Sequence, residues 1–421
     1  MSFFSRLFSR KQNSQSHILA LDIGTEFIKA LIFKVNYEKE VAEVIGVGRQ
    51  RQKPTDMQGG IATDISGVAL SSEKAIERAY EMCDVKPTQA ILGIAGELVK
   101  GSTTTVHYQR GSPKSKIDLP ELKNIVQKIQ WKAFDNVRKE LSWETCQNEM
   151  DVKLINAVIV NVRIDGYRVT NPLGFQGKDI SISIFNAYAP LVHLGALQTI
   201  AQDLGLDLLT ITAEPYAVAK ATGIEEDLDF SAIFIDMGGG TTDVAVVRNG
   251  GMEGIKMFAL GGRAFTKRLV TKFNISFTEA EDKKIKYSAG LLPKNEAEKI
   301  KNLFKNDLEV WATGVELSLS EFSSTELLPS KILLCGGASA LPGVRQVLQS
   351  EEWTEKLPMT KKPSIHFIKP SDITNIVDKT SLLVDQQDIT PMALANLSLD
   401  FSGTEKILPG ILRRVVKMMQ T

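Results

Sequence analysis

Two short segments combine aspartate, glycine and threonine in a pattern suited to binding phosphate. The first reads Asp22-Ile-Gly24-Thr25, and the second runs from Asp236 to Asp243 with the sequence DMGGGTTD. A glycine in a turn lets the backbone approach a phosphate closely and aims its N–H groups at the oxygens. Threonine hydroxyls add further donors. The sequence therefore predicts two phosphate-binding turns, with contacts from Gly24, Thr25, Gly238, Gly239, Gly240, Thr241 and Thr242.

An aspartate precedes each predicted turn and cannot itself hold a phosphate, because like charges repel. Mg²⁺ keeps several of its waters when it binds between carboxylates and phosphates. We therefore expect Asp22 and Asp236 to hold Mg²⁺ through water, with the two turns clamping a triphosphate from both sides. A single Asp-x-Gly is more often an ordinary hairpin turn. The longer copy at the matching place in the second half argues against that explanation.

Each turn joins two β-branched runs, at 17–21 and 29–35 and again at 231–235 and 244–248. The glycines lead back into a strand, whereas a Rossmann glycine motif opens a helix, and the chain contains no GxxxxGK[ST]. Helical spacing occurs at 71–82, 191–204, 263–273 and 295–319, with further strands at 91–94 and 331–334. This pattern predicts an α/β protein with two related halves.

The stretch from about 87 to 188 differs from both halves in its order of polar segments, helices and strands. A polar segment, 101–116, precedes a helix opened by Asp118 and Pro120, and two strands follow at 154–164 and 179–188. We interpret it as an inserted subdomain.

The composition excludes several classes of protein. Fifty Lys+Arg balance fifty Asp+Glu, so the chain lacks the net positive charge that is typical of a general nucleic-acid binder. No apolar run reaches the roughly 18 residues that span a bilayer, and residues 1–11 lack the pattern of a secretory signal. Cys83, Cys146 and Cys335 are scattered, and the histidines show no zinc spacing. These features predict a protein of the cytoplasm.

The paired turns resemble those of the actin, sugar-kinase and heat-shock-chaperone ATPase superfamily. Residues 213–219 (AEPYAVA) are similar to its connecting motif, residues 334–343 (LCGGASALPG) to its adenosine motif and residues 391–397 to its second connecting helix. The resemblance implies two actin-like (ribonuclease H-like) domains around a nucleotide cleft that holds ATP and Mg²⁺. It also implies residue roles. Glu214 would orient the attacking water, Asp236 would act with it in catalysis, Glu281 and Lys284 would grip adenine and ribose, and Gly336 and Gly337 would approach the nucleotide.

Two residues depart from the superfamily pattern. Ala338 stands where a third glycine is common, and Glu26 stands where a small residue is usual. We expect Glu26 to place a negative charge near the phosphates and to oppose nucleotide binding. At most a slow ATPase is expected.

Within the superfamily, the insertion resembles that of FtsA, the actin homologue that anchors the bacterial division ring. Residues 91–96 and the Asn-Pro-Leu-Gly segment at 171–174 carry this resemblance, together with the intact DMGGGTTD. Lys29, seven residues after the first aspartate, favours the related PilM family of type IV pilus assembly instead. A sugar-kinase phosphotransferase is the third alternative, but no sugar-pocket carboxylate has a distinctive motif.

Both ends of the chain have amphipathic helical spacing. In the tail, Ile411, Leu412, Val415, Val416, Met418 and Met419 lie on one side of a helical wheel, and Arg413, Arg414 and Lys417 lie on the other. At the start, Phe3, Phe4, Leu7 and Phe8 form a similar stripe. Such helices can lie in the headgroup region of an anionic membrane. The alternatives are a tail that packs on its own domain and an unstructured start.

The expected organisation is an N-terminal segment (1–16), a first domain (17–86 and 189–228), the insertion (87–188), a second domain (229–400) and a spacer with a tail helix (401–421). FtsA resemblance implies self-assembly into protofilaments at the division site, peripheral to the cytoplasmic face of the membrane. It also implies that the tail of the tubulin-like division protein binds the smaller lobe of the second domain, at about 261–329. A PilM-like protein would bind a pilus membrane-protein tail instead.

Overall fold

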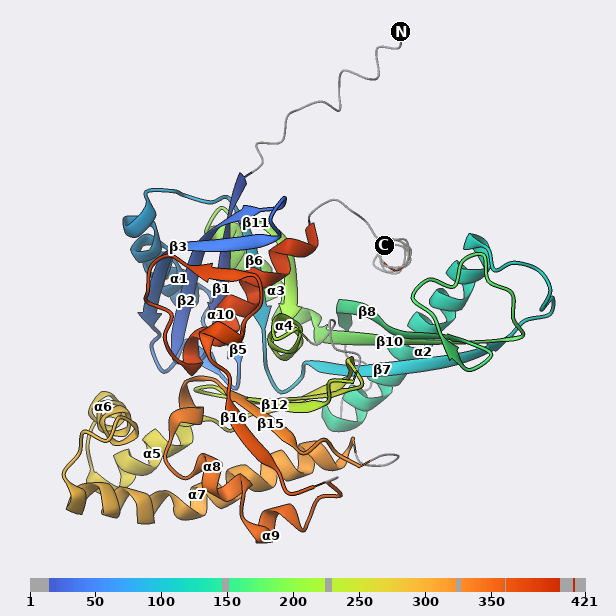
Figure 1. Cartoon of the computed structure of the whole chain (residues 1–421). Coiled ribbons are helices and arrows are strands. Elements are labelled where there is room, and N and C mark those ends of the chain that lie inside the picture. Colours follow the sequence, from blue (N-terminus) through green and yellow to red (C-terminus); the bar gives the residue numbers. More distant parts are fainter. Residues whose placement is uncertain are drawn as a thin grey trace.

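The computed structural model describes residues 15–145, 151–223, 229–322, 327–359, 361–401 and Leu412. In this part of the chain the strands form two large sheets and one short hairpin, β4 (Met57–Gln58) with β5 (Ile61–Ala62). Figure 1 shows the blue first lobe above the gold and orange second lobe, with the teal and green insertion extending to one side.

The first lobe is built on a six-stranded sheet in the order β11-β6-β1-β2-β3-β17. β1, β2 and β3 are antiparallel neighbours, whereas β6 runs parallel to β1 and β11 runs parallel to β6. The bounds are β1 (Gln15–Ile23), β2 (Phe27–Asn36), β3 (Val41–Arg51), β6 (Gln89–Ile94), β11 (Asp207–Ala213) and β17 (Ile376–Asp378).

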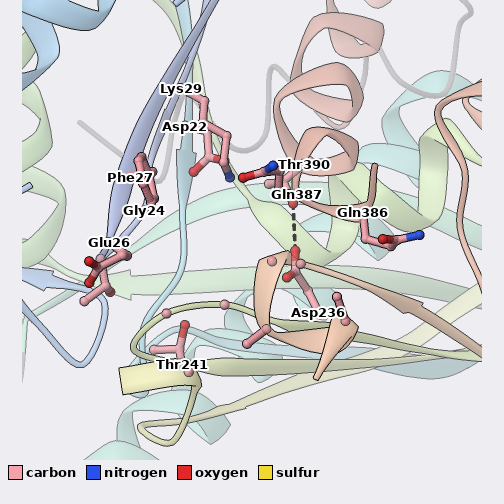
Figure 2. Close-up of a pocket in the computed structure, with 18 of the residues that line it drawn as sticks. Asp22, Gly24, Glu26, Phe27, Lys29, Asp236, Thr241, Gln386, Gln387 and Thr390 are labelled. Carbon is pink, nitrogen blue, oxygen red and sulfur yellow. Dashed lines mark hydrogen bonds and ion pairs between the residues drawn. The ribbon is translucent and has the colours of Figure 1, made fainter. Parts of the chain in front are cut away.

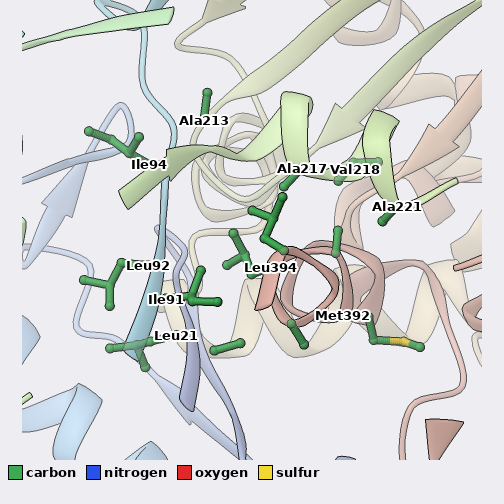
Figure 3. Packing of buried hydrophobic residues seen from close by; sticks show 14 of the residues in the cluster. Leu21, Ile91, Leu92, Ile94, Ala213, Ala217, Val218, Ala221, Met392 and Leu394 are labelled. Carbon is green, nitrogen blue, oxygen red and sulfur yellow. The ribbon is translucent and has the colours of Figure 1, made fainter. Parts of the chain in front are cut away.

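Four helices cover this sheet: α1 (Ile65–Cys83), α3 (Leu191–Asp203), α4 (Glu214–Ala221) and α10 (Ile389–Asn396). α1 packs on β3 at very close range, because a Cβ added to Gly48 would lie 1.8 Å from the Ala75 carbonyl oxygen. All residues of α10 are buried, and the helix contacts β1, β6 and α4. Figure 3 shows this packing, with Leu394 of α10 near Ile91 of β6 and Ala217 of α4.

The second lobe repeats the strand order of the first. Its strands β14-β13-β12-β15-β16 match β3-β2-β1-β6-β11 in order and direction, with three antiparallel neighbours followed by two parallel strands. The predicted duplication into two α/β halves is therefore confirmed. The bounds are β12 (Ala232–Met237), β13 (Thr242–Arg248), β14 (Gly251–Phe258), β15 (Lys331–Cys335) and β16 (Ser364–Phe367).

Helices on the second sheet enclose a separate apolar core around Trp311, Phe265 and Phe304. They are α5 (Gly262–Phe273), α6 (Phe277–Ser288), α7 (Lys294–Ser320), α8 (Val344–Leu348) and α9 (Glu351–Thr354). Ser276 and Glu279 form a capping box that begins α6. Short 3-10 turns cover Gly337–Ala340, Pro370–Asp372, Gln386–Asp388 and Leu397–Phe401.

The insertion extends the second sheet rather than forming a sheet of its own. β7 (Lys100–Gln109) pairs with β14 at Ser102–Gly254 and Gly101–Ile255, and the order continues as β7-β10-β8-β9. The other strands are β8 (Val152–Ile164), β9 (Tyr167–Arg168) and β10 (Asp179–Pro190), and α2 (Leu119–Thr145) packs on β7 and β10. As expected, Asp118 begins α2, accepting a bond from the Glu121 N–H at 2.9 Å.

The structure differs from the sequence expectations in three places. Much of the stretch expected as polar, 101–116, is strand β7, because Val106 and Tyr108 on one face pack on the insertion core while Thr105, His107 and Gln109 occupy the other face. Residues 89–94 lie inside the predicted insertion but form β6 of the first sheet, where the crossover through α1 returns the chain beside β1. β17 and α10, expected in the second domain, pack on the first sheet. Among the described residues, no helix is long and apolar enough to cross a bilayer.

Candidate functional site

The two predicted phosphate turns meet at the bottom of a cleft between the lobes. A Cβ added to Gly240 would lie 2.5 Å from the Thr25 Oγ1, and one added to Gly239 would lie 2.9 Å from the Glu26 Cβ. Both turns line a cavity of about 670 Å³ (Figure 2). Glycines are needed here because no side chain would fit between the turns.

Four of the carboxylates that line this cavity interact with one another: Asp22, Asp236, Asp243 and Glu214. Burial, together with Asp22, Asp243 and Asp236, raises the pKa of Glu214 well above its usual range. Burial followed by Asp236 does the same to the pKa of Asp243. Asp243 is buried, and its Oδ1 has no hydrogen-bond partner among the described residues. Such a cluster holds more negative charge than its surroundings neutralise, which favours a cation.

Lys29 partly balances this charge. Its Nζ donates to Asp22 Oδ2 at 2.8 Å, across the register pair Asp22–Lys29 of β1 and β2. Burial lowers the pKa of Lys29, but Asp22, with Asp236 and Glu214 behind it, raises the pKa overall. The lysine is therefore a fixed positive charge beside the phosphate turns.

Asp236 lies at the end of β12, where Thr390 of α10 donates to its Oδ2 at 2.7 Å (Figure 2). Burial raises the pKa of Asp236, while this hydrogen bond and Lys29 lower it. Gly336 lies against the same carboxylate with φ +85°, and a Cβ there would be 2.1 Å from Asp236 Oδ1. The first turn of α10 and the predicted adenosine motif thus converge on one carboxylate.

Glu214 begins α4 directly after β11, with Pro215 in the first helical turn. Its side chain lies against Gly93 of β6, where a Cβ would be 2.5 Å from Glu214 Oε1. It lines the same cavity as both turns. A carboxyl with a raised pKa beside the two predicted phosphate turns has the properties of a group that can orient or activate water.

The far side of the cavity is formed by α5 and α6. Lys284 Nζ lies 2.8 Å from Glu281 Oε2 and donates to the Gly262 carbonyl at 3.1 Å and to Thr266 Oγ1 at 3.0 Å. Thr266 in turn donates to Glu281. Both charged residues are buried and line the cavity. They form a rigid acid–base pair at the end where the sequence resemblance puts adenine and ribose.

Most predicted site residues come together in this one cavity, and two do not line it. Those in its lining are Asp22, Gly24, Thr25, Glu214, Asp236, Gly238, Gly239, Thr241, Glu281, Lys284, Gly336 and Gly337. Gly240 packs against Thr25 instead. Thr242 is buried. Its hydroxyl donates to the Leu260 carbonyl and accepts from Trp311 Nε1, so it stabilises the turn on the side away from the cavity. The predicted phosphate contact of Thr242 is therefore corrected.

Several lining residues were not among the predicted site residues: Lys29, Arg49, Asp243, Arg263, Gln386 and Thr390. Asp243 ends the DMGGGTTD motif, and Lys29 follows the first turn on the adjacent strand, so both could have been found from spacing. Arg263 and Thr390 come from helices remote in sequence and carry no local signal.

Two lobes of the same strand order, with paired phosphate-type turns in the cleft between them, define the actin-like ATPase fold. Within that class the chain is similar to FtsA: the family model "Cell division protein FtsA" matches residues 233–380. FtsA of Neisseria meningitidis serogroup B is 26% identical over 277 residues, 66% of this chain and 62% of that protein. FtsA of Streptococcus pneumoniae serotype 2 is 24% identical over 348 residues, 78% of this chain and 72% of that protein. The matched part thus spans less than two thirds of the Neisseria protein.

A solved structure, a chain of the PilM–PilN type IV pilus biogenesis complex, superposes with a TM-score of 0.63 at 16% identity. The superposition covers 92% of this chain and 99% of the PilM–PilN complex chain. At this identity the likeness shows the fold alone. The predicted actin-like architecture and the similarity to FtsA are confirmed.

Proposed function

We propose that this chain is an FtsA-like, ATP-binding actin homologue that polymerises at the cytoplasmic membrane and anchors the tubulin-like division ring. The observation that carries the nucleotide part is the meeting of both phosphate turns with four carboxylates in one cavity. The similarity to FtsA supports the division part.

The cavity residues fit a hydrated Mg²⁺ with a triphosphate. Asp22 and Asp236 would hold the ion through water. The Oδ1 of Asp243, which accepts no hydrogen bond from the part of the chain that the structure describes, would offer a further acceptor for a metal-bound water. A divalent cation would favour the ionised form of this cluster and neutralise phosphate charge. Glu214 would orient water for a slow hydrolysis, with Asp236 beside it, and Glu281 and Lys284 would bind the ribose and base.

Binding measurements on aspartate variants test the nucleotide part. Asp236→Ala should abolish the Mg²⁺-dependent part of ATP binding, measured by calorimetry with and without the metal, and should leave the fold intact by circular dichroism. Asp22→Ala should act in the same direction, although it also leaves Lys29 without its carboxylate. Unchanged ATP affinity in both variants would contradict the phosphate assignment.

The membrane part rests on the two amphipathic ends, which lie outside the described residues except for Leu412. That leucine is buried in an apolar cluster with residues of α2 and the insertion strands, including Leu122, Ile125 and Ile182. Membrane binding by the apolar side of the tail therefore requires Leu412 to leave this cluster. For the ring partner, the proposed contact is the lobe formed by α5, α6 and α7, within about 261–329.

The alternative is a PilM-like platform that binds the tail of a pilus membrane protein. The position of Lys29 favours it, and the fold is compatible with it. Titrating labelled tail peptides of the tubulin-like division protein and of a pilus membrane protein separates the two. Saturable binding of the pilus peptide alone would replace the division-ring proposal.

A further inference from the structure

Arg263, in the first turn of α5, contacts both phosphate turns at once. Its backbone N–H donates to the Gly239 carbonyl at 2.8 Å, within the second turn. Its guanidinium reaches the first turn, where Nη2 donates to the Thr25 carbonyl at 2.6 Å and Nε donates to Glu26 Oε2 at 2.9 Å. One residue of the second lobe thus connects the two turns that form the bottom of the cleft.

The same guanidinium also binds the segment that follows β3. Nη1 donates to the Met57 carbonyl at 2.8 Å and to the Pro54 carbonyl at 3.1 Å. All four acceptors of the Arg263 guanidinium named above belong to the first lobe. The planar guanidinium donates hydrogen bonds in several directions at once. It therefore holds its position far better than the flexible side chain of a lysine would.

Glu26 is shared between two arginines. Arg51 Nε donates to Glu26 Oε1 at 2.8 Å from within the first lobe, and Arg263 takes the other oxygen. The Glu26 side chain is only 11% exposed and that of Arg263 only 12%, so water screens the pair weakly. The negative charge expected to oppose phosphate is therefore used to connect the lobes.

We propose that Arg263 and Glu26 form a cross-lobe clasp that keeps the two phosphate turns in contact and limits the rate at which nucleotide enters and leaves. Separation of the turns requires the guanidinium to leave Glu26 and the carbonyl groups of the first lobe together. Loss of charge-assisted bonds of this kind shifts an equilibrium by about tenfold or more. The rate effect rests on the proposed nucleotide function, whereas the clasp itself can be tested without nucleotide.

The nucleotide-free test measures the distance between spin labels on the two lobes. Labels are attached at Glu73→Cys in α1 and Lys299→Cys in α7, both exposed positions, in a Cys83→Ser and Cys146→Ser background. In Arg263→Ala and in Glu26→Gln we expect the distribution to broaden and to extend to longer distances. Arg268→Ala is the matched control, because Arg268 lies on the same helix but pairs with Asp307 within the second lobe. A wild-type distribution in Arg263→Ala and Glu26→Gln would overturn the clasp.

The second measurement is the dissociation rate of a fluorescent ATP analogue with Mg²⁺. Arg263→Ala should release it about ten times faster or more, and Arg263→Lys should be intermediate, because lysine keeps the charge but loses the fork. Arg268→Ala should keep the wild-type rate. If Arg263→Ala fails to fold, Glu26→Gln decides the question alone. Absence of analogue binding in the wild type would refute the nucleotide function and leave the distance test in force.

Discussion

The protonation of Glu214 and of Asp243 depends on the neighbouring carboxylates in the cleft. Burial raises the pKa of Glu214 and of Asp243, and each neighbouring carboxylate adds to the effect. The folded protein therefore keeps protons that the unfolded chain releases. Folding stability then falls as pH rises, from the ordinary carboxyl range up through the raised pKa values.

Replacing Glu214 by Gln should weaken this pH dependence. Glutamine carries no charge, so the loss of stability between about pH 5 and pH 8 should be smaller than in the nucleotide-free wild type. Thermal unfolding across that range measures it, with the exposed Glu73→Gln as control. A slope equal to that of the wild type would contradict the raised pKa of Glu214. ATP turnover should also fall in Glu214→Gln while affinity is kept, since the proposed role is to orient water.

The adjacent glycines of the predicted adenosine motif should respond very differently to alanine. Gly336 has φ +85° and lies against Asp236, whereas a Cβ on Gly337 would meet only Gln387 at 3.7 Å. Gly336→Ala should therefore lower the free energy of unfolding by about 1–3 kcal/mol or more, and Gly337→Ala by much less. Urea denaturation measures both. Equal losses would show that the close approach at Gly336 is not needed.

At the scale of elements, the strands next to the phosphate turns were predictable because alternation and β-branched residues mark them directly. β7 was missed because its threonines and serines read as a polar loop, and only pairing with β10 and β14 makes them a strand. α10 was predicted as an element of the second domain. All of its residues are buried and it has no single apolar face, so periodicity does not tell which lobe buries it.

The tail is the segment predicted to bind the membrane. Removing residues 410–421 should release the protein from anionic vesicles and leave nucleotide binding unchanged, as measured by co-sedimentation and calorimetry. Val415→Asp with Val416→Asp should act similarly, because carboxylates would face the acyl boundary. Added salt should weaken vesicle binding only in part, since it screens Arg413, Arg414 and Lys417 but not apolar burial.

Two outcomes would contradict the membrane role of the tail. Full co-sedimentation of the truncated protein would shift the anchor to Phe3, Phe4, Leu7 and Phe8. A fall of several degrees in the melting temperature on truncation would identify the tail as a packed element. The burial of Leu412 among Leu122 and Ile125 makes that second measurement decisive.

At the scale of the whole molecule, one weak anchor per chain gives only marginal attachment, but a polymer carries many. With ATP and Mg²⁺, the fraction bound to vesicles should therefore rise more steeply than in proportion to protein concentration. Co-sedimentation over a concentration series measures this, with Asp236→Ala as the variant expected to lose the steepness. A simple hyperbolic curve in the wild type would argue against polymerisation on the membrane.

The arrangement of lobes was partly predictable from sequence. The repeated Asp–Gly–Thr hairpins indicated two halves, and the cavity residues around Asp22 and Asp236 follow from them. The clasp did not follow, because Arg263 and Glu26 lie 237 positions apart, and the sequence gives no sign that they meet: Arg263 is typical of a surface charge, and Glu26 was expected to oppose phosphate. Long-range ion pairs leave no periodic signature in the chain.

The closing elements of the first lobe, β17 and α10, have a consequence for synthesis on the ribosome. Both come from 376–396, yet they cover strands made from the first 94 residues. Until they emerge, apolar side chains of β1 and β6 such as Leu21 and Ile91 lack part of their cover. Contacts of such large sequence separation form slowly. We therefore expect nascent chains that stop before about residue 376 to be prone to aggregation. The native first lobe should assemble only after translation is nearly complete.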